Sequence, residues 1–444
     1  MFTRSPRGTA SMTALALSLA FAATPARAQD ASTAELRQQI DALQRQVEQI
    51  ERREAASADV SRAQSQVLDD ANRRSQLLQS GGVTSGYDGS SFFLSSSDGK
   101  FTLKPLAHFQ VRNATVFREG AAPDGEDDWQ NGFEIRRMKL GARGNLFDKN
   151  LTYLFIWGAR VNSGTIFLDE AWARYKFDNG LAVRAGQFKD PLNRESQTPS
   201  HLLLSCERSY QTDLFFGMDN YVQGISLSYE DAALPVKGEV AFTDGAISTN
   251  GNFQDPPTGV DQNFGVAGRV DYKAFGDWKT VGDFAAARVE TDTLAFGAGI
   301  DYTEGEQLDA GTKQVIRYTA DGIYKLASNW SFYAAVNGRH TEVKGGANSN
   351  DWGALAQVAW SPDDKIEPFV RYGYSYFDSA AAGSEASVHE ITAGVNHYIH
   401  GQNAKLTLDL TYLPNGAPYA DSGADILLSH DAEVVLRAQF QLAL

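Results

Sequence analysis

The feature that most constrains this chain is an alternation of polar and apolar residues over residues 101–444. In one such segment, Ile366 and Val370 share one face of an extended chain, whereas Glu367 and Arg371 share the other. We count sixteen segments of this kind, each ten to fourteen residues long. Period-two alternation predicts β-strands with one apolar and one polar face. We therefore expect an all-β protein with sixteen antiparallel strands.

The connections between these segments alternate between long and short. Long loops at one end of the strands and short turns at the other are typical of a closed outer-membrane β-barrel, and a soluble sandwich does not need this asymmetry. Two connections break the pattern: a tight turn at 163–164 and a longer stretch at 274–291. The long connections are 119–131, 190–219, 245–262, 305–312, 343–351, 379–387 and 414–430, and the short ones are 147–150, 178–180, 232–235, 326–329, 362–365 and 400–403.

Residues 1–28 have the three parts of a secretory signal peptide. Arg4 and Arg7 supply the positive start, an apolar run follows at 12–23, and Ala-Arg-Ala at 26–28 matches a small-x-small cleavage site. No later stretch approaches 18 continuous apolar residues. An exported chain of this kind can therefore span a membrane only as a closed barrel.

The polar segment 29–80 has apolar residues spaced as in a heptad repeat. This spacing predicts a helical coiled coil in the periplasm, and the alternative is a single solvated helix. The Gly- and Ser-rich residues 81–100 are expected to form a flexible linker to a barrel over 101–444. The heptad positions are Leu36, Ile40, Leu43, Val47 and Ile50.

Several function classes find no support in the sequence. The net charge of −15 argues against nucleic acid as a partner. No G-x-S-x-G, H-E-x-x-H, C-x-x-C or P-loop motif is present, so we expect no enzyme activity, no cofactor and no metal. His397 and His400 are explained by their place at a strand end. Cys206 is the single cysteine and is expected to be inert.

Aromatic residues fall near the ends of the segments, on their apolar faces. Rings at such positions are typical of the two membrane–water interfaces, and ordinary core packing is the alternative. We predict this role for Tyr175, Phe177, Tyr302, Trp330, Trp360, Tyr398 and Tyr412.

Four sequence blocks resemble a known family, the phosphate-selective porins of the O/P type. They are EIRRMKLGARG at 134–144, LDEAWARY at 168–175, RAGQFKDP at 184–191 and ERS at 207–209. The resemblance covers residues 101–444. It implies a sixteen-stranded trimeric barrel with an inward-folded third loop, and a coiled coil ahead of the barrel is similar to versions of this family in some bacterial lineages.

The polar strand faces carry about twice as many basic as acidic residues, although the whole chain is acidic. Basic side chains offset the dehydration of an anion in a narrow channel. The alternative is that they pair with nearby acids, such as Arg174 with Glu170 and Arg371 with Glu367, and only keep the lumen polar. We predict that the pore-lining bases are Arg137, Lys139, Arg143, Arg160, Arg174, Lys176 and Arg184. Further candidates are Lys104, Arg112, Lys237, Arg269, Arg317, Lys325, Arg339, Arg371, Lys405 and Arg437.

The long connection at 190–219 is expected to form the constriction of this channel. The resemblance implies that phosphate-selective members are rich in lysine at this point. No lysine occurs from 190 to 220, which favours a broader anion channel or a general diffusion pore over strict phosphate selectivity. We thus expect a homotrimeric channel for small hydrophilic solutes, in contact with outer-membrane lipid. The competing hypotheses are an adhesive or structural protein tethered by its coiled coil and a soluble secreted β-protein. The predicted constriction residues are Lys189, Arg194, His201, Glu207 and Arg208.

Overall fold

The computed structural model divides the chain into two units, Met1–Leu77 and Leu78–Leu444. In the first unit, the described residues are helical and exposed. The signal peptide at 1–28 and most heptad positions lie outside the described residues, so the coiled coil over 29–80 stays a prediction. The structure describes residues 41–42, 44–45, 47–48, 65–70, 82–89, 91–120, 125, 128–161, 163–217, 220–248, 264–308, 311–378, 386–417 and 424–444.

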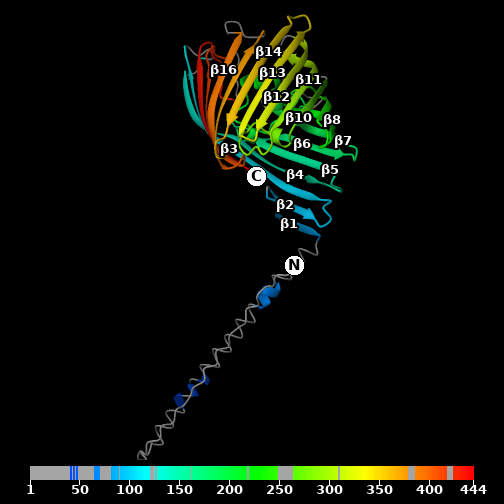
Figure 1. The fold of residues 1–444 in the computed structure, drawn as a ribbon, viewed down its shortest axis with the longest axis vertical. Helices are drawn as coiled ribbons and strands as arrows, with labels where there is room; N and C mark the ends of the chain where they lie inside the picture. Colours follow the sequence, from blue (N-terminus) through cyan, green and yellow to red (C-terminus); the bar gives the residue numbers. More distant parts are fainter. Residues whose placement is uncertain are drawn as a thin grey trace, which may run out of the picture. The chain divides into compact units, whose positions relative to one another are not determined.

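The second unit is a closed antiparallel β-barrel (Figure 1). Its first and last strands, β3 and β18, pair from Glu433↔Arg118 to Ala443↔His108. The sixteen strands predicted over 101–444 are thus confirmed within the described residues. They are β3 (Thr102–Arg118), β4 (Trp129–Asn145), β5 (Leu151–Ala159), β6 (Ile166–Lys176), β7 (Leu181–Lys189), β8 (Tyr221–Glu230), β9 (Val236–Thr243), β10 (Phe264–Phe275), β11 (Thr293–Leu308), β12 (Gly311–Leu326), β13 (Trp330–Val343), β14 (Ser349–Trp360), β15 (Ile366–Tyr376), β16 (Ser387–His400), β17 (Ala404–Leu413) and β18 (Glu433–Ala443).

Two further strands occupy the segment that was predicted to be a linker. β1 (Val83–Tyr87) pairs with β2 (Phe92–Ser96) along its whole length, and β2 pairs with the start of β3 through two residues. The prediction of a flexible linker over 81–100 is therefore wrong. Its glycines serve tight turns, as at Gly89 with a φ of 95°, and the β-forming residues between them pair with the barrel sheet.

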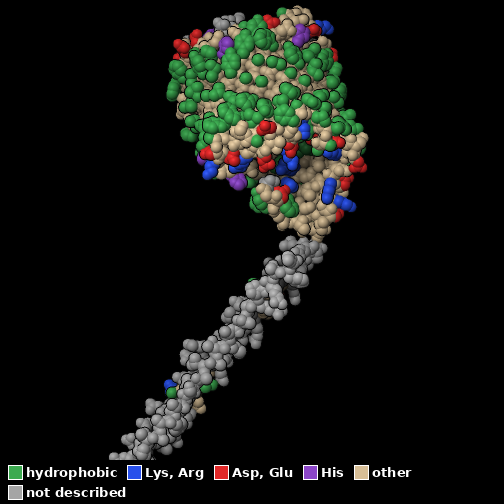
Figure 2. Space-filling view, viewed as in Figure 1, with side chains coloured by type: hydrophobic (Ala, Val, Ile, Leu, Met, Phe, Trp, Pro, Cys, Tyr) green, Lys and Arg blue, Asp and Glu red, His purple; other side chains and the backbone are tan. Residues whose placement is uncertain are grey.

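The outward faces of the strands are apolar. Figure 2 shows hydrophobic side chains covering the barrel wall, with charged residues and histidines gathered toward its two ends. Trp330 and Trp360 are 38% and 40% exposed, and their rings stack across β13 and β14 with centroids 5.7 Å apart. Tyr398 is an exception, since it is only 4% exposed and donates its hydroxyl to Glu367 on the inner face. The prediction of an outward-facing ring is therefore wrong for Tyr398.

Most connections have the predicted lengths, with two informative differences. β11 and β12 run on to Leu308 and from Gly311, so the loop predicted at 305–312 is mostly strand. The connection after β7 folds into the barrel and carries α2 (Arg194–Gln197), η1 (Ser200–Leu202) and α3 (Tyr210–Phe216). No helix among the described residues has the length and apolarity to cross a membrane.

The connection from β7 to β8 is hereafter the inward loop (residues 190–220). Its aromatic residues Tyr210, Phe215 and Phe216 are almost fully buried. They pack in one cluster with Val388 of β16 and with Phe377, which directly follows β15. The barrel interior thus contains an apolar core, which is why a loop of this length adopts a fixed fold there.

Candidate functional site in the barrel interior

Local sequence signals start and stop the helices of the inward loop. The Asn193 side chain accepts a hydrogen bond from the backbone of Ser196, and the Ser209 side chain accepts one from Thr212. These are N-caps of α2 and α3. Gly217, with a φ of 77°, ends α3 in a conformation that glycine adopts without strain.

Ion pairs fix α2 to β10 and β12. Arg194 Nε lies 2.6 Å from Asp321 Oδ1 on β12, and its Nη2 lies 2.7 Å from Asp271 Oδ1 on β10. Both carboxylates also pair with Arg269. The predicted constriction residue Arg194 is therefore a buried anchor with its charge compensated.

Glu207 fixes the other end of the loop to β3 and β4. Its carboxylate oxygens lie 2.7 Å from Arg112 Nη1, 2.6 Å from Arg136 Nε and 2.6 Å from Arg137 Nη2. Burial alone would raise the pKa of Glu207, but Arg136, Arg137 and Arg112 hold this pKa far below its usual value. The carboxylate is charged at any physiological pH.

The sequence reasoning missed Arg136 as an inner-face residue. Strict alternation places it opposite Arg137, on the lipid face. A β-bulge shifts the register of β3 against β4 between Gln110 and Val111 and leaves Arg136 unpaired on β4. A bulge lets two successive side chains point the same way, and no sequence signal marked this one.

The remaining loop residues are also held by the protein. Arg208 is 1% exposed and donates to the backbone carbonyls of Glu195, Ser196 and Thr198. Lys189 Nζ lies 2.9 Å from the Ser196 carbonyl oxygen. Of the predicted constriction bases, Arg208 therefore stabilises the fold of the loop, and Lys189 is half-buried beside the loop.

His201, unlike the loop residues above, has another histidine as its neighbour. Its ring lies beside the ring of His108, with centroids 5.4 Å apart. Burial, and then the charges of Lys405, Lys189 and Lys139, lower the pKa of His201 to about 4. The ring is therefore neutral at pH 7. Its neighbourhood is a cavity of about 320 Å³ that is also lined by Arg143 and Glu170.

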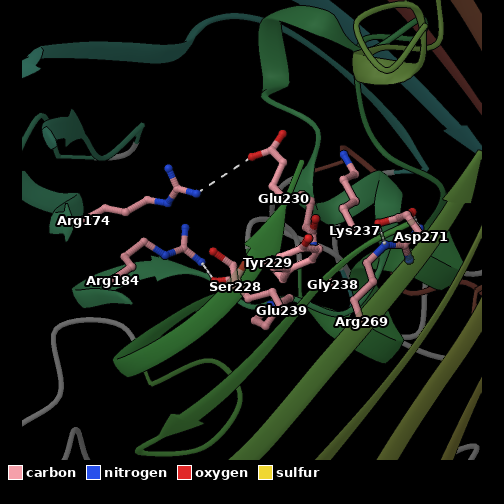
Figure 3. A pocket seen from close by; sticks show the side chains of 12 residues that line it. Arg174, Arg184, Ser228, Tyr229, Glu230, Lys237, Gly238, Glu239, Arg269 and Asp271 are labelled. Carbon is pink, nitrogen blue, oxygen red and sulfur yellow. Dashed lines mark hydrogen bonds and ion pairs between the residues drawn. The ribbon is translucent and has the colours of Figure 1, made fainter. Parts of the chain in front are cut away.

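A cavity of about 270 Å³ lies on the inner face of β6 to β10, below the inward loop. Figure 3 shows Arg174 and Arg184 on one side of this cavity, with Lys237 and Arg269 across from them. Arg174 Nη2 lies 3.8 Å from Glu230, and Arg184 Nη2 lies 2.5 Å from Glu239. The lining residues are Arg174, Arg184, Pro191, Gln197, Ser228, Tyr229, Glu230, Lys237, Gly238, Glu239, Arg269 and Asp271.

Two cations in these cavities have no carboxylate within 4 Å among the described residues. They are Arg143, which is exposed, and Lys237, which is half-buried and lies over the ring of Trp278. Of the cluster predicted at 137–143, Arg137 pairs with Glu207 and Lys139 with Asp169, at 2.5 Å.

Two predicted bases lie at the ends of their strands. Arg160 follows β5, is exposed, and lies over the ring of Phe167 at 5.1 Å. Lys176 is the last residue of β6 and is exposed. Neither lines the two cavities described above.

On the other side of the barrel, the predicted lumen bases pair with acids. Arg317 lies 3.3 Å from Asp301, and Arg437 lies 2.8 Å from Asp409. The specific pairs predicted from the sequence are wrong. Arg371 pairs with Glu390 at 2.6 Å rather than with Glu367, and Arg174 pairs with Glu230 rather than with Glu170. These partners lie on other strands, Glu390 on β16 and Glu230 at the end of β8, so spacing along one strand does not reveal them.

Residues 112–442 match the family model of the phosphate-selective porins O and P. The chain belongs to this family. The porin is therefore an outer-membrane channel for small solutes. A search of curated proteins finds no match to it. No group of three or more His, Cys, Asp or Glu residues in its described ranges is placed to hold a metal ion.

Solved structures share the fold of this porin at low identity. The anion-selective porin from Comamonas acidovorans has 12% identity and a TM-score of 0.55, over 77% of this chain and 99% of its own. OprB of Pseudomonas putida has 9% identity and a TM-score of 0.52, over 77% and 94%. OmpT of Vibrio cholerae has 12% identity and a TM-score of 0.51, over 77% and 98%.

Proposed function

We propose that the porin conducts small anions in preference to cations, along one side of its interior. We call this side the open wall: Lys139, Arg143, Glu170, Arg174, Arg184, Lys237 and Glu239. The observation that carries the proposal is that these side chains are exposed or partly buried and line the two cavities, whose full lining has seven Lys or Arg residues and four Asp or Glu residues. A row of hydrated bases lowers the cost of moving an anion through a narrow channel.

The bases on the opposite side do not contribute to this preference. The closed wall consists of the inner-face residues of β11 to β17, such as Arg317 and Arg371. Arg317 and Arg371 are 2% exposed and are paired with carboxylates, and Arg339, whose side chain is 21% exposed, is paired with Asp351. A solute does not reach them, and their charge is compensated where they stand.

We further propose that selectivity is broad rather than restricted to phosphate. Lys189 and Arg208 of the predicted constriction donate to backbone carbonyls, and the inward loop brings no other lysine. Open-wall bases lie at separate points along the wall rather than clustered around one oxyanion. The anion-selective porin from Comamonas acidovorans shares this fold, which is consistent with a general anion path.

The assembly that we propose is a homotrimer in outer-membrane lipid, with residues 29–80 forming a coiled coil in the periplasm. The exposed apolar wall supports the lipid contact. We assign no catalytic role to any residue and no cofactor.

The test is the reversal potential of the purified protein in planar bilayers under a KCl gradient. We expect the reversal potential to have the sign of an anion-selective pore. We also expect phosphate to block the chloride current only weakly. A cation-selective reversal would refute the anion preference, and strong phosphate block would refute broad selectivity. An absence of current from folded protein would favour a structural or adhesive role.

A further inference from the structure

The connection between β10 and β11 is the exception at the short-turn end of the barrel. This β10–β11 segment (residues 276–292) carries η2 (Thr280–Gly282). The other connections at this end are turns of a few residues. A segment of this length is expected to lie on the surface, but Val281, Phe284 and Ala286 are 5%, 2% and 0% exposed.

These residues are buried inside the barrel, against the closed wall. Phe284 packs on Tyr333 of β13 with ring centroids 4.7 Å apart. The same apolar cluster includes Leu203 and Leu204 of the inward loop. The two inward-folded segments therefore share one core, and together they fill this side of the interior. The wall residues in the cluster are Ala295, Ile323, Tyr333, Ala335, Leu355, Ala359 and Phe369.

Polar contacts fix the segment in place. The Glu367 carboxylate accepts hydrogen bonds from the backbone of Ala286 at 2.5 Å and of Ala287 at 3.2 Å. Lys325 Nζ lies 2.5 Å from the Asp283 carboxylate. Buried groups satisfied in this way specify one position for a segment, because releasing it leaves them unpaired.

The other end of the segment reaches the open wall. The Trp278 ring lies under Lys237 Nζ at 4.7 Å and under Lys273 Nζ at 5.4 Å. Its Nε1 donates to the Leu234 carbonyl in the β8–β9 turn, at 3.2 Å. Lys237 also lines the cavity below the inward loop. Trp278 thus stands beside the route from that cavity to the periplasmic end.

We propose that the β10–β11 segment is a second constriction, which limits solute size at the periplasmic exit and confines the exit to the open wall. This inference rests on the proposed channel function. The inward loop and the segment then act in series, with the open-wall bases between them. The segment sets how large a solute passes, and the bases set which charge is preferred.

The first test replaces residues 277–291 with Asn-Gly, a two-residue turn that suits antiparallel strands. We expect single-channel conductance to rise at least about twofold, and liposome swelling to admit larger sugars than the native protein does, because the exit widens. The sign of the reversal potential should stay anionic, since the open-wall bases are unchanged. Unaltered conductance in this variant, with folding checked by heat-modifiable gel mobility, would overturn the proposal.

The second test keeps the chain length and so decides the matter if the shortened chain does not fold. Trp278→Ala should raise conductance measurably and weaken exclusion of the largest permeant sugars. Trp352→Ala is the matched control, since that ring is 48% exposed on the lipid face and its loss should change neither. Equal conductance of both variants and the native protein would overturn the proposal. Failure of the native protein itself to conduct would instead refute the proposed channel function.

Discussion

The open and closed walls of the barrel interior carry the same kinds of residue but differ in what covers them. Arg184 and Lys237 on the open wall are half-buried, whereas Arg317 and Arg371 on the closed wall are both 2% exposed. The apolar residues of the β10–β11 segment, with Leu203 and Leu204 of the inward loop, pack against the closed wall. Polar anchors of the same loop also reach β3, β4 and β10. A basic residue on an inner strand face is therefore partly exposed to a cavity on one side, even where it is ion-paired as Arg184 is with Glu239, and is fully buried in its ion pair on the other.

The difference has an energetic origin. A buried arginine loses its hydration and must gain carboxylate or carbonyl partners, as Arg371 does from Glu390 and from loop carbonyls. The open-wall bases stay partly hydrated, and the charges of Arg143 and Lys237, which have no carboxylate within 4 Å among the described residues, act on a passing ion. The closed wall thus holds the loop, and the open wall selects the solute.

The largest effect is expected from Glu207→Gln, which breaks the anchor between the loop and β3 and β4. Three buried arginines lose their shared carboxylate, and a broken buried pair typically costs about 3–5 kcal/mol. We expect a noisier and larger single-channel current. We also expect the gel mobility of the folded protein to be lost at a lower temperature than in the native protein. Glu230→Gln is the control, because its side chain is 51% exposed. If the single-channel current of Glu207→Gln is as quiet and as small as that of the native protein, this anchor does not determine the conductance of the pore.

The next largest effect concerns the open wall itself. Replacement of Arg143, Arg174 and Lys237 by Gln removes three accessible charges without touching the loop anchors. We expect the anion preference to fall toward zero selectivity, read as a reversal potential approaching zero, while folding is retained. If this triple variant keeps the native reversal potential, the open-wall bases do not cause the anion preference.

A smaller effect on conduction is expected from the closed wall, although its effect on stability is larger. Arg317→Gln leaves Asp301 buried without its partner, so we expect reduced resistance to urea and an unchanged reversal potential. The double variant Arg317→Gln with Asp301→Asn should recover most of that resistance, because both charges are gone. A changed reversal potential in the double variant would place Arg317 on the ion path.

The smallest effect is expected when the pH is lowered and the reversal potential is measured. The pKa of His201 is lowered to about 4, so the ring gains a positive charge only as pH falls through that value. A charge in the cavity beside Arg143 adds to anion preference, and we expect the reversal potential to become more anionic between about pH 5 and about pH 3. Carboxylates titrate in the same range, so His201→Gln serves as the reference. Identical pH profiles of the two proteins would exclude a contribution from His201. The charged or titratable groups around it are His108, Lys139, Arg143, Glu170, Lys189, Asp283 and Lys405.

Much of the fold was readable from the sequence alone. Alternation fixes which face of a strand is apolar, and loop lengths fix which end is which, because both follow from the pleat and from the water–lipid boundary. The pairing of β18 with β3 follows from the need to close the barrel. The paired β1 and β2 were missed, because Gly- and Ser-rich composition is shared by linkers and by tight turns.

The division of the barrel interior was decided by tertiary structure. Alternation placed Arg143 and Arg317 alike on inner faces, yet only the folded loop determines which of them meets water. The bulge that turns Arg136 inward and the burial of 276–292 likewise depend on partners distant in the chain. The sequence by itself determined a membrane barrel with a basic interior. Burial by the inward loop and the β10–β11 segment decided which charges remain for a solute, because hydration, unlike alternation, is set by three-dimensional contact.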